Sequence, residues 1–322
     1  MAHGETSDQA SLSIACAIGA SVAFSINDIT VRSFSATLPL HEVVLFRSLF
    51  GLAITLLVFA NGKSLVEVFR TRRPGLHVIR GLCVVVANFA FFAGLAALPL
   101  AEASAIFFVA PLLITAFSAI ILREYVGPRR WFALMIGMVG VLLIVRPGSV
   151  AFQWAVMLPA LSAIAYASLH TITRNMGLSE SAIAMSAYIQ VTFVVVCLAI
   201  GLVFGRGQFA GMGHPSLEFL FRAWTIPTLQ DFLMFAVAGA CSSTGGYLIG
   251  QAYRSSSAGL VAPFEYTALV LAAFWGYAIW GEVPGLLSAF GIVLILFSGV
   301  FVAIRESLLK VQPTAKRVSG RR

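Results

Sequence analysis

Two charged side chains lie inside apolar stretches of this sequence, where each could bind an oppositely charged part of a small molecule. Glu265 stands in the apolar run Ala262–Glu282, and Arg47 stands in the run Leu38–Ala60. Charged residues inside membrane helices are rare, and they usually face a protein interior or a water-filled path. A carboxylate and a guanidinium at a similar depth would suit a zwitterion, with Glu265 contacting an ammonium group and Arg47 a carboxylate.

Both charges are expected near the middle of a membrane. Glu265 lies roughly 10 Å from one end of its expected helix, and Arg47 lies roughly 14 Å from the opposite end of its own. In a hydrocarbon core about 30 Å thick, their depths differ by only about 6 Å. Two structural alternatives stay open. Glu265 could pair with Arg80, or it could lie in the first turn of a helix that restarts at Pro263, where exposed N–H groups favour a carboxylate.

Aromatic and amide side chains extend this candidate binding site. Such aromatics could form a cavity wall that stacks on a flat or apolar substrate, although they also serve as packing or as interface belts. An amide inside a membrane helix binds either substrate or a neighbouring helix. The candidates, with Arg47 and Glu265, are Tyr266, Phe107, Tyr166, Trp275 and Asn88.

Two similar segments place polar residues near the ends of their helices. Asp28 in "AFSINDITVR" falls opposite His170 in "AYASLHTITR". Their depth favours gating or helix capping for Asp28, His170 and Arg80 over a central proton relay. The five histidines are scattered, and the four cysteines lie in apolar segments without metal or disulfide spacing. We therefore expect no metal, no cofactor and no catalytic centre, and a membrane enzyme is disfavoured.

The composition is that of a protein that spans a membrane many times. Hydrophobic residues make up 59% of the 322 residues, whereas charged residues make up only 11%. Soluble domains carry about 25% charged residues, so this chain has too little polar surface for a water-soluble globule. The net charge of +8 comes from short loops and the C-terminal tail, a pattern that sets membrane orientation and does not indicate nucleic-acid binding.

Ten apolar segments are close to the roughly 20 residues that a spanning helix needs. With the N-terminus inside, fifteen Lys and Arg residues fall on the cytoplasmic side and four fall outside. This bias predicts a multi-pass protein of the cell inner (plasma) membrane with both termini in the cytoplasm. The segments are approximately Leu12–Phe34, Leu38–Ala60, Pro74–Leu98, Leu100–Leu122, Arg130–Val145, Phe152–Asn175, Ser181–Phe204, Phe232–Ser255, Ala258–Gly281 and Leu286–Ile304.

The ten segments divide into two similar halves. Asp28 corresponds to His170, and Glu124 at the end of the fourth segment corresponds to Glu282 at the end of the ninth. Five is odd, so the second half enters the membrane from the opposite side, and the fold expected is all-α with two inverted five-helix repeats. The predicted units are residues 1–148, residues 149–309 and a basic cytoplasmic tail at residues 310–322.

Three stretches resemble the EamA family of the drug/metabolite transporter superfamily. They are "LPLHEVVLFRSLFG", the region from "LPLAEASAIFFVAPLL" to "VLLIVRPG", and "SSAGLVAPFEYTALVLAAFWGYAIWGEVP". The resemblance implies a ten-helix carrier of small organic metabolites, with Glu124 and Glu282 as the acidic residues that end the fourth helix of each repeat. Family substrates include amino acids, riboflavin and S-adenosylmethionine.

The expected function is therefore secondary transport by alternating access. Export of amino acids or related zwitterionic metabolites suits Arg47 and Glu265, whereas uptake of a larger nutrient such as riboflavin or S-adenosylmethionine is the alternative. An ATP-driven pump is disfavoured because the sequence has no G-x-x-x-x-G-K-[ST] loop. The partners expected are a small-molecule substrate and the lipid bilayer. Proton coupling and the choice between a monomer and a homodimer stay open.

Overall fold

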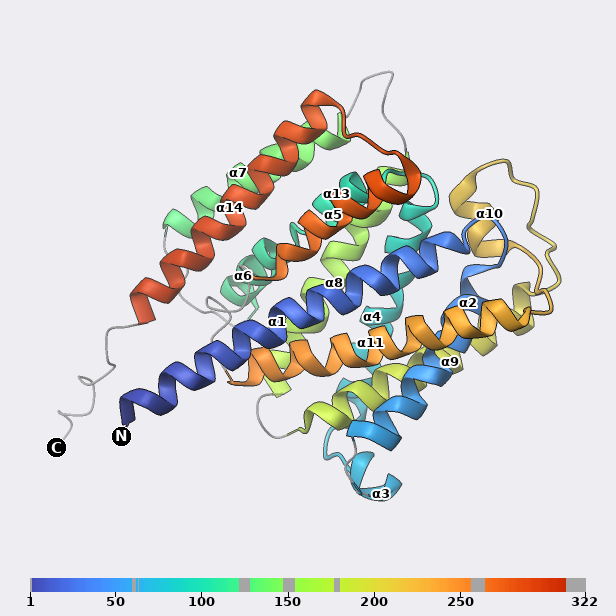
Figure 1. Ribbon diagram of the computed structural model, residues 1–322, viewed down its shortest axis with the longest axis horizontal. Coiled ribbons are helices and arrows are strands. Elements are labelled where there is room, and N and C mark those ends of the chain that lie inside the picture. Colours follow the sequence, from blue (N-terminus) through green and yellow to red (C-terminus); the bar gives the residue numbers. More distant parts are fainter. Residues whose placement is uncertain are drawn as a thin grey trace.

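The computed structural model describes residues 2–59, 62, 64–121, 128–146, 154–176, 180–255 and 264–310, and throughout these ranges the chain forms helices and connections without a strand (Figure 1). Six helices are long and apolar enough to cross a membrane: Ser11–Ser33, Leu40–Val58, Pro74–Leu95, Trp154–Thr173, Ile183–Phe204 and Leu229–Ala252. Four predicted segments contain shorter apolar helices: Leu100–Ile114, Trp131–Val145, Thr267–Trp280 and Leu286–Ser298. The all-helical, multi-pass class that the sequence predicts agrees with this architecture.

The elements follow the predicted segments closely, with short extra helices in two connections. They are α1 (Ala2–Ser33), α2 (Leu40–Ile54) with a π-helix (Thr55–Phe59), α3 (Leu65–Val68), α4 (Pro74–Leu95), α5 (Leu100–Phe107), α6 (Ala110–Ile120), α7 (Pro128–Val145), a 3₁₀ turn (Trp154–Val156), α8 (Met157–Met176), α9 (Ala182–Phe204), α10 (Pro215–Phe221), α11 (Leu229–Ser255), α13 (Thr267–Trp280) and α14 (Leu286–Lys310).

The fourth predicted segment is not one helix but two, α5 and α6. Pro111 lies in the first turn of α6. Proline has no N–H, and its ring clashes with the carbonyl four residues earlier, which here belongs to Phe107. The chain accordingly leaves the α-helix at Phe108 and Val109. The apolar run Leu100–Leu122 predicted a continuous helix across this point, and that prediction was wrong.

The ninth predicted segment is interrupted at the corresponding place. Phe264 and Glu265 are helical, Tyr266 lies in a turn, and α13 begins at Thr267. Pro263, the predicted restart point, lies outside the described residues, as does Glu124. Non-helical backbone at membrane depth is tolerated only where protein buries it or where it lines a cavity. Two matched interruptions therefore mark the interior of this bundle.

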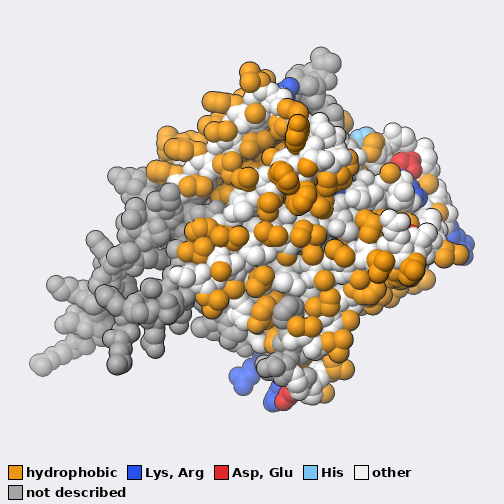
Figure 2. Space-filling view, viewed as in Figure 1, with side chains coloured by type: hydrophobic (Ala, Val, Ile, Leu, Met, Phe, Trp, Pro, Cys, Tyr) orange, Lys and Arg blue, Asp and Glu red, His pale blue; other side chains and the backbone are white. Residues whose placement is uncertain are grey.

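The helices pack in pairs that join the two halves of the chain. α1 packs along α11, α4 along α8, α7 along α14, and α5 along α13, while α2 lies against both α9 and α11 (Figure 1). Figure 2 shows that hydrophobic side chains cover much of one outer face and that the charged side chains lie at its borders. The buried side chains between the helices form one main core that runs from Val31 to Ile295.

Small residues allow several of these close contacts. A Cβ atom at Gly94 of α4 would lie 2.8 Å from Cδ of Pro159 in α8, so the small residues of Ala90-x-x-x-Gly94 lie at a close contact inside the bundle. Gly246-x-x-x-Gly250 of α11 has the same spacing but differs, because a Cβ at Gly246 would meet no atom of the described residues within 4 Å. Gly239 of α11 is in close contact with α2, because a Cβ there would lie 2.5 Å from the backbone oxygen of Arg47.

Candidate functional site

The two helix interruptions touch each other inside the bundle. The hydroxyl of Tyr266 donates a hydrogen bond to the carbonyl oxygen of Phe108 at 3.4 Å, and the two rings are 5.5 Å apart. Tyr266 is only 3% exposed. Half-helix ends of this kind expose backbone groups that can bind polar or charged parts of a ligand.

Glu265 lies beside this meeting point, within reach of two tyrosines. Its charge acts on the hydroxyls of Tyr166 in α8 and Tyr266. The ring of Tyr166 in turn contacts Phe107 at 5.1 Å and His170 at 4.3 Å. Glu265, Tyr166, Phe107 and His170 all keep some exposed surface although they lie deep in the bundle. Four of the predicted site residues thus form one group with Tyr266, built by α5, α8 and the start of the ninth segment.

Arg47 belongs to a second group, built by α1, α2 and α4. Its guanidinium donates to the side-chain oxygens of Asn27 at 3.3 Å and Asn88 at 3.1 Å. The amide of Asn27 donates to Asp28 at 3.0 Å. Arg47 is 1% exposed, and its Cζ lies 5.1 Å from the ring centre of Phe193. Asp28, predicted near a gate, therefore lies at the side of the buried arginine.

Aromatic rings of α4 connect the two groups. Phe91 contacts Phe107 at 5.1 Å and Phe92 at 5.5 Å. The ring of Phe92 lies 5.9 Å from the guanidinium carbon of Arg47. A single row of aromatic side chains thus runs from the helix interruption to the buried arginine. We define the candidate site as Glu265, Tyr266, Phe107, Tyr166 and His170 together with Arg47, Asp28 and Asn88.

Two further predicted residues lie at the edges of the candidate site. Trp275 of α13 donates through its indole N–H to the hydroxyl of Ser25 in α1 at 3.3 Å. Arg80, the alternative partner proposed for Glu265, donates to the hydroxyl of Thr173 at 2.7 Å and to the carbonyl of Met185 at 3.0 Å. Its charge also acts on His170, which contacts Tyr166.

Glu282 is part of the frame around the site. Gly281 ends α13 in the left-handed conformation (φ 64°), and the backbone N–H of Glu282 donates to the carbonyl of Gly276 at 3.0 Å. The Glu282 carboxylate forms an ion pair with Arg32 of α1 and accepts from the backbone N–H of Leu100 at 2.9 Å. This one side chain therefore ties together the ends of α1, α5 and α13.

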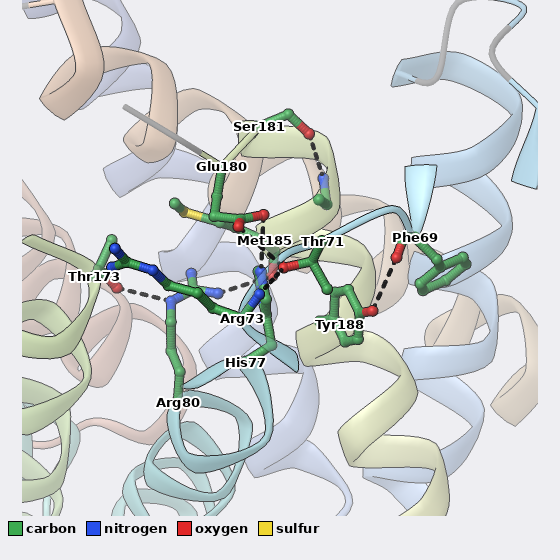
Figure 3. A network of polar contacts seen from close by, with 11 residues as sticks. Phe69, Thr71, Arg73, His77, Arg80, Thr173, Glu180, Ser181, Met185 and Tyr188 are labelled. Carbon is green, nitrogen blue, oxygen red and sulfur yellow. Dashed lines mark hydrogen bonds and ion pairs between the residues drawn. The ribbon is translucent and has the colours of Figure 1, made fainter. Parts of the chain in front are cut away.

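A second polar cluster lies at the opposite end of the bundle (Figure 3). Glu180, just before α9, accepts from the hydroxyl of Thr71 at 3.0 Å, and its carboxylate lies 3.3 Å from Nε2 of His77. The ring of His77 stacks on Tyr188 at 4.3 Å. Burial acts to raise the pKa of Glu180, but the bonds from His77 and Thr71 outweigh it and hold the pKa below the usual value.

Glu42 has a place in the first half that matches Glu180 in the second. Both are acidic residues at the start of a long helix, and both accept a hydrogen bond from a connection in the other half of the chain. The backbone N–H of Thr225 donates to Glu42 at 3.2 Å, as Thr71 donates to Glu180. Neither residue was among the predicted site residues, although the similar triplets "LHE" at 40–42 and "LSE" at 178–180 could have indicated them.

Known transporters are similar to this chain in sequence. The sequence profile of the EamA-like transporter family matches residues 11–146. The chain is 26% identical over 287 residues to an S-adenosylmethionine uptake transporter of Rickettsia prowazekii (strain Madrid E), covering 88% of this chain and 90% of that protein.

Two further relatives have other named substrates. A riboflavin transporter of Rhizobium johnstonii is 27% identical over 76% of this chain and 75% of its own length. The pseudopaline exporter CntI of Pseudomonas aeruginosa is 27% identical over 87% of this chain and 92% of its own length. A solved crystal structure superposes with a TM-score of 0.64 at 20% identity, over 93% of this chain and 99% of that one, which supports the fold alone.

Proposed function

This chain belongs to the EamA-like transporter family, and from that premise we propose that it carries a zwitterionic, amino-acid-bearing metabolite across the membrane by alternating access. The transported molecule binds at the candidate site, between the two halves of the chain. The observation that carries the proposal is the meeting of two interrupted helices beside Glu265. In secondary transporters, such discontinuous helices lie at the substrate site near the middle of the membrane.

The arrangement of the helices supports two inverted five-helix repeats, residues 1–148 and 149–309. Exchanging the halves converts the α1–α11 pair into the α8–α4 pair, and it leaves the pairs α2–α9, α5–α13 and α7–α14 unchanged. The matched acidic residues Glu42 and Glu180 follow the same exchange. Rocking of one repeat against the other would expose the candidate site to each side in turn.

The chemistry of the site favours a substrate with a positive group and a flat ring. Glu265 supplies a carboxylate, Arg47 a guanidinium, and the row Phe91, Phe107 and Tyr166 supplies aromatic surface. A carboxylate in a low-dielectric site binds ammonium or sulfonium groups strongly. S-adenosylmethionine, which carries an amino-acid group, a sulfonium and an adenine, matches all three features. None of the three relatives above is named for a plain amino acid, so the larger metabolite is the first compound to test.

Riboflavin transport is the second candidate, and the aromatic row is the observation that favours it. A flat ring system stacks on aromatic side chains without needing an ionic contact. Riboflavin has no cationic group, so its binding would use Phe91, Phe107 and Tyr166 and would depend little on Glu265. The two candidates therefore differ in how they respond to one substitution.

Transport into and out of proteoliposomes tests the proposal. Radiolabelled S-adenosylmethionine, riboflavin and a mixture of amino acids are compared in wild type, Glu265→Gln and the control Glu102→Gln. Glu102 is a half-buried carboxylate in the first turn of α5 and lies outside the candidate site. We expect Glu265→Gln to reduce S-adenosylmethionine flux by about tenfold or more, the effect of losing a charged hydrogen-bond partner. Unchanged flux in a folded variant would contradict the role of Glu265, and riboflavin flux alone would select the second candidate.

The orientation in the cell is also a proposal. The excess of Lys and Arg in alternate connections favours both termini in the cytoplasm and an inner (plasma) membrane location. Fusing a fluorescent protein to the C-terminus, and alkaline phosphatase in a parallel fusion, tests it. Fluorescence without phosphatase activity is expected, and the reverse pattern would contradict the orientation.

A further inference from the structure

Arg47 carries a buried positive charge that its hydrogen-bond partners do not neutralise. Its two acceptors in the described part of the chain, the side-chain oxygens of Asn27 and Asn88, are neutral, and its Nε is buried without a hydrogen-bond partner among those residues. The rest of its surroundings are largely apolar, with the rings of Phe193 and Phe92 at 5.1 and 5.9 Å. A buried ion without a counter-charge is strongly destabilising, so the structure requires an anion near this group.

Asp28 is the acidic side chain placed to supply that anion. The side chain of Asn27 bridges the two charges, because its oxygen accepts from Arg47 while its amide donates to Asp28 at 3.0 Å. α1 ends at Ser33 and α2 begins at Leu40 on the same side of the bundle. Asp28 lies about 8 Å and Arg47 about 10 Å from those ends, so the two side chains are at the same level.

Asp28 is not completely enclosed by protein. It keeps exposed surface, whereas Arg47 keeps almost none. The lipid-facing side of α1 is marked by Ile18 and Val22, which are 39% and 41% exposed. An α-helix turns by about 100° per residue, so the Asp28 side chain points about 100° around the helix axis from that side. Its exposed surface therefore lies away from the lipid-facing side of α1.

We propose that Asp28 and the substrate carboxylate serve in turn as the counter-charge of Arg47, so that one proton is taken up by Asp28 when the carboxylate binds. This inference rests on the proposed function and adds its coupling ion. The carboxylate takes the place of the Asn88 oxygen at Arg47, and Asp28 becomes a neutral acid. The charge of the site is the same before and after binding, which avoids leaving Arg47 uncompensated in a low-dielectric interior.

Among the described residues, Arg47 is the charged group that acts on Asp28. From α2, Asp28 faces Arg47, beside which α9 places the thiol of Cys197. From α4 the uncharged Asn88 binds Arg47, and from α13 Trp275 binds Ser25, which lies one turn before Asp28 in α1. On α11, the glycine Gly245 packs against Phe24.

A double-mutant cycle without substrate tests the charge pairing itself. Thermal unfolding of the purified protein in detergent is measured for wild type, Asp28→Asn, Arg47→Gln and the double variant. Asp28→Asn leaves Arg47 without its counter-charge, so we expect it to lower the melting temperature and the added Arg47→Gln to restore part of the loss. Glu102→Gln in place of Asp28→Asn is the control and should combine additively with Arg47→Gln. Additive effects of Asp28→Asn and Arg47→Gln would overturn the proposal.

The second test measures how binding depends on pH. S-adenosylmethionine and its decarboxylated analogue are titrated into wild type and Asp28→Asn over a series of pH values. For wild type, affinity for the carboxylate-bearing ligand should fall by up to about tenfold per pH unit on the alkaline side, the slope for one linked proton. Asp28→Asn should bind it without this slope, and the analogue should show no slope in either protein.

The outcomes separate the two proposals. The same pH slope in Asp28→Asn, or no slope for the carboxylate-bearing ligand in wild type, would overturn the role of Asp28 as proton acceptor. Failure of every ligand to bind would count against the proposed function. In that case, the ligand-free cycle still decides whether Asp28 is the counter-charge of Arg47.

Discussion

The hydroxyl of Tyr266 donates a hydrogen bond to the carbonyl of Phe108, and this bond joins two helix interruptions that are 158 residues apart in the chain. A backbone carbonyl that leaves its helix within a membrane must find another partner, because no water is available in the hydrocarbon core. The tyrosine of one half supplies that partner to the other half. The same contact fixes Tyr266 beside Glu265, so the stability of the interruption and the geometry of the site are linked.

Removing the Tyr266 hydroxyl should weaken both the stability of the protein and the binding of substrate. Tyr266→Phe keeps the ring contact with Phe108 but loses the hydrogen bond, and we expect a cost of about 0.5–1.5 kcal/mol in the free energy of unfolding. Substrate affinity should fall as well, since the position of Glu265 becomes less defined. Thermal unfolding in detergent and binding titrations measure the two effects. Tyr277→Phe is the control, because Tyr277 is 66% exposed on the outer surface; equal effects of the two variants would contradict this argument.

The Arg32–Glu282 ion pair should be important for stability rather than for substrate choice. Arg32 also lies 4.2 Å from the ring centre of Trp280, and Glu282 accepts from the N–H of Leu100. The side chains are 10% and 21% exposed, so water screens the pair only in part. We expect Glu282→Gln to cost about 2 kcal/mol of unfolding free energy, less than for a fully buried pair.

Lysine should replace Arg32 poorly, because the guanidinium contacts both carboxylate oxygens and a single ammonium cannot reproduce that geometry. Melting temperatures of Arg32→Lys, Glu282→Gln and the exposed control Arg206→Gln measure these effects. A Glu282→Gln variant that unfolds like wild type, or one that changes substrate preference, would show that the pair has a different role.

The sequence predicted the helices better than it predicted their interior contacts. Apolar runs of sufficient length, with Pro39, Pro74 and Pro99 at or just before helix starts, placed the starts of α2, α4 and α5 within a few residues. The interruption at Phe108 was missed although Pro111 signals it, because apolar length alone was used to define that helix. In the ninth segment, the turn at Tyr266 has no proline at the required spacing in the described residues.

The candidate site was predicted as a set of residues, not as an arrangement. Counting residues along a helix gives depth but no direction around the axis, so Asp28 was assigned to a gate and Arg47 was matched with Glu265. In the structure, Asn27 connects Asp28 to Arg47, while Glu265 lies with Tyr166. Such contacts depend on how helices from different halves rotate against each other, and a single sequence does not specify that rotation.

The Glu180 cluster should make stability depend on pH in the acid range. The pKa of Glu180 in the folded protein lies below its ordinary value of 4.5, so folding favours the ionised carboxylate. Its contribution is fully present above that ordinary value and is lost as the pH falls through the lower, folded-state pKa. Glu180→Gln should therefore be less stable than wild type at neutral pH, and the difference should shrink in acid.

Melting temperatures of wild type and Glu180→Gln across a pH series measure this difference. Glu102→Gln is again the control, since the first turn of α5 is separate from the Thr71 and His77 contacts. A difference that stays constant with pH would mean that the carboxylate charge is not what stabilises this cluster.

The contact between α2 and α11 offers a matched pair of glycine substitutions on one helix. A Cβ added at Gly239 would lie 2.5 Å from the carbonyl oxygen of Arg47 and 2.7 Å from Cβ of Phe50, so the helices must separate. Overpacking of this kind costs about 1–3 kcal/mol, and here it would also displace the helix that carries Arg47. Gly246→Ala meets no atom within 4 Å, and its higher helix propensity should leave stability unchanged or raised by up to about 1 kcal/mol. Unfolding and transport assays on both variants should show losses for Gly239→Ala alone, and equal behaviour of the two would mean that α2 and α11 do not pack closely at this level.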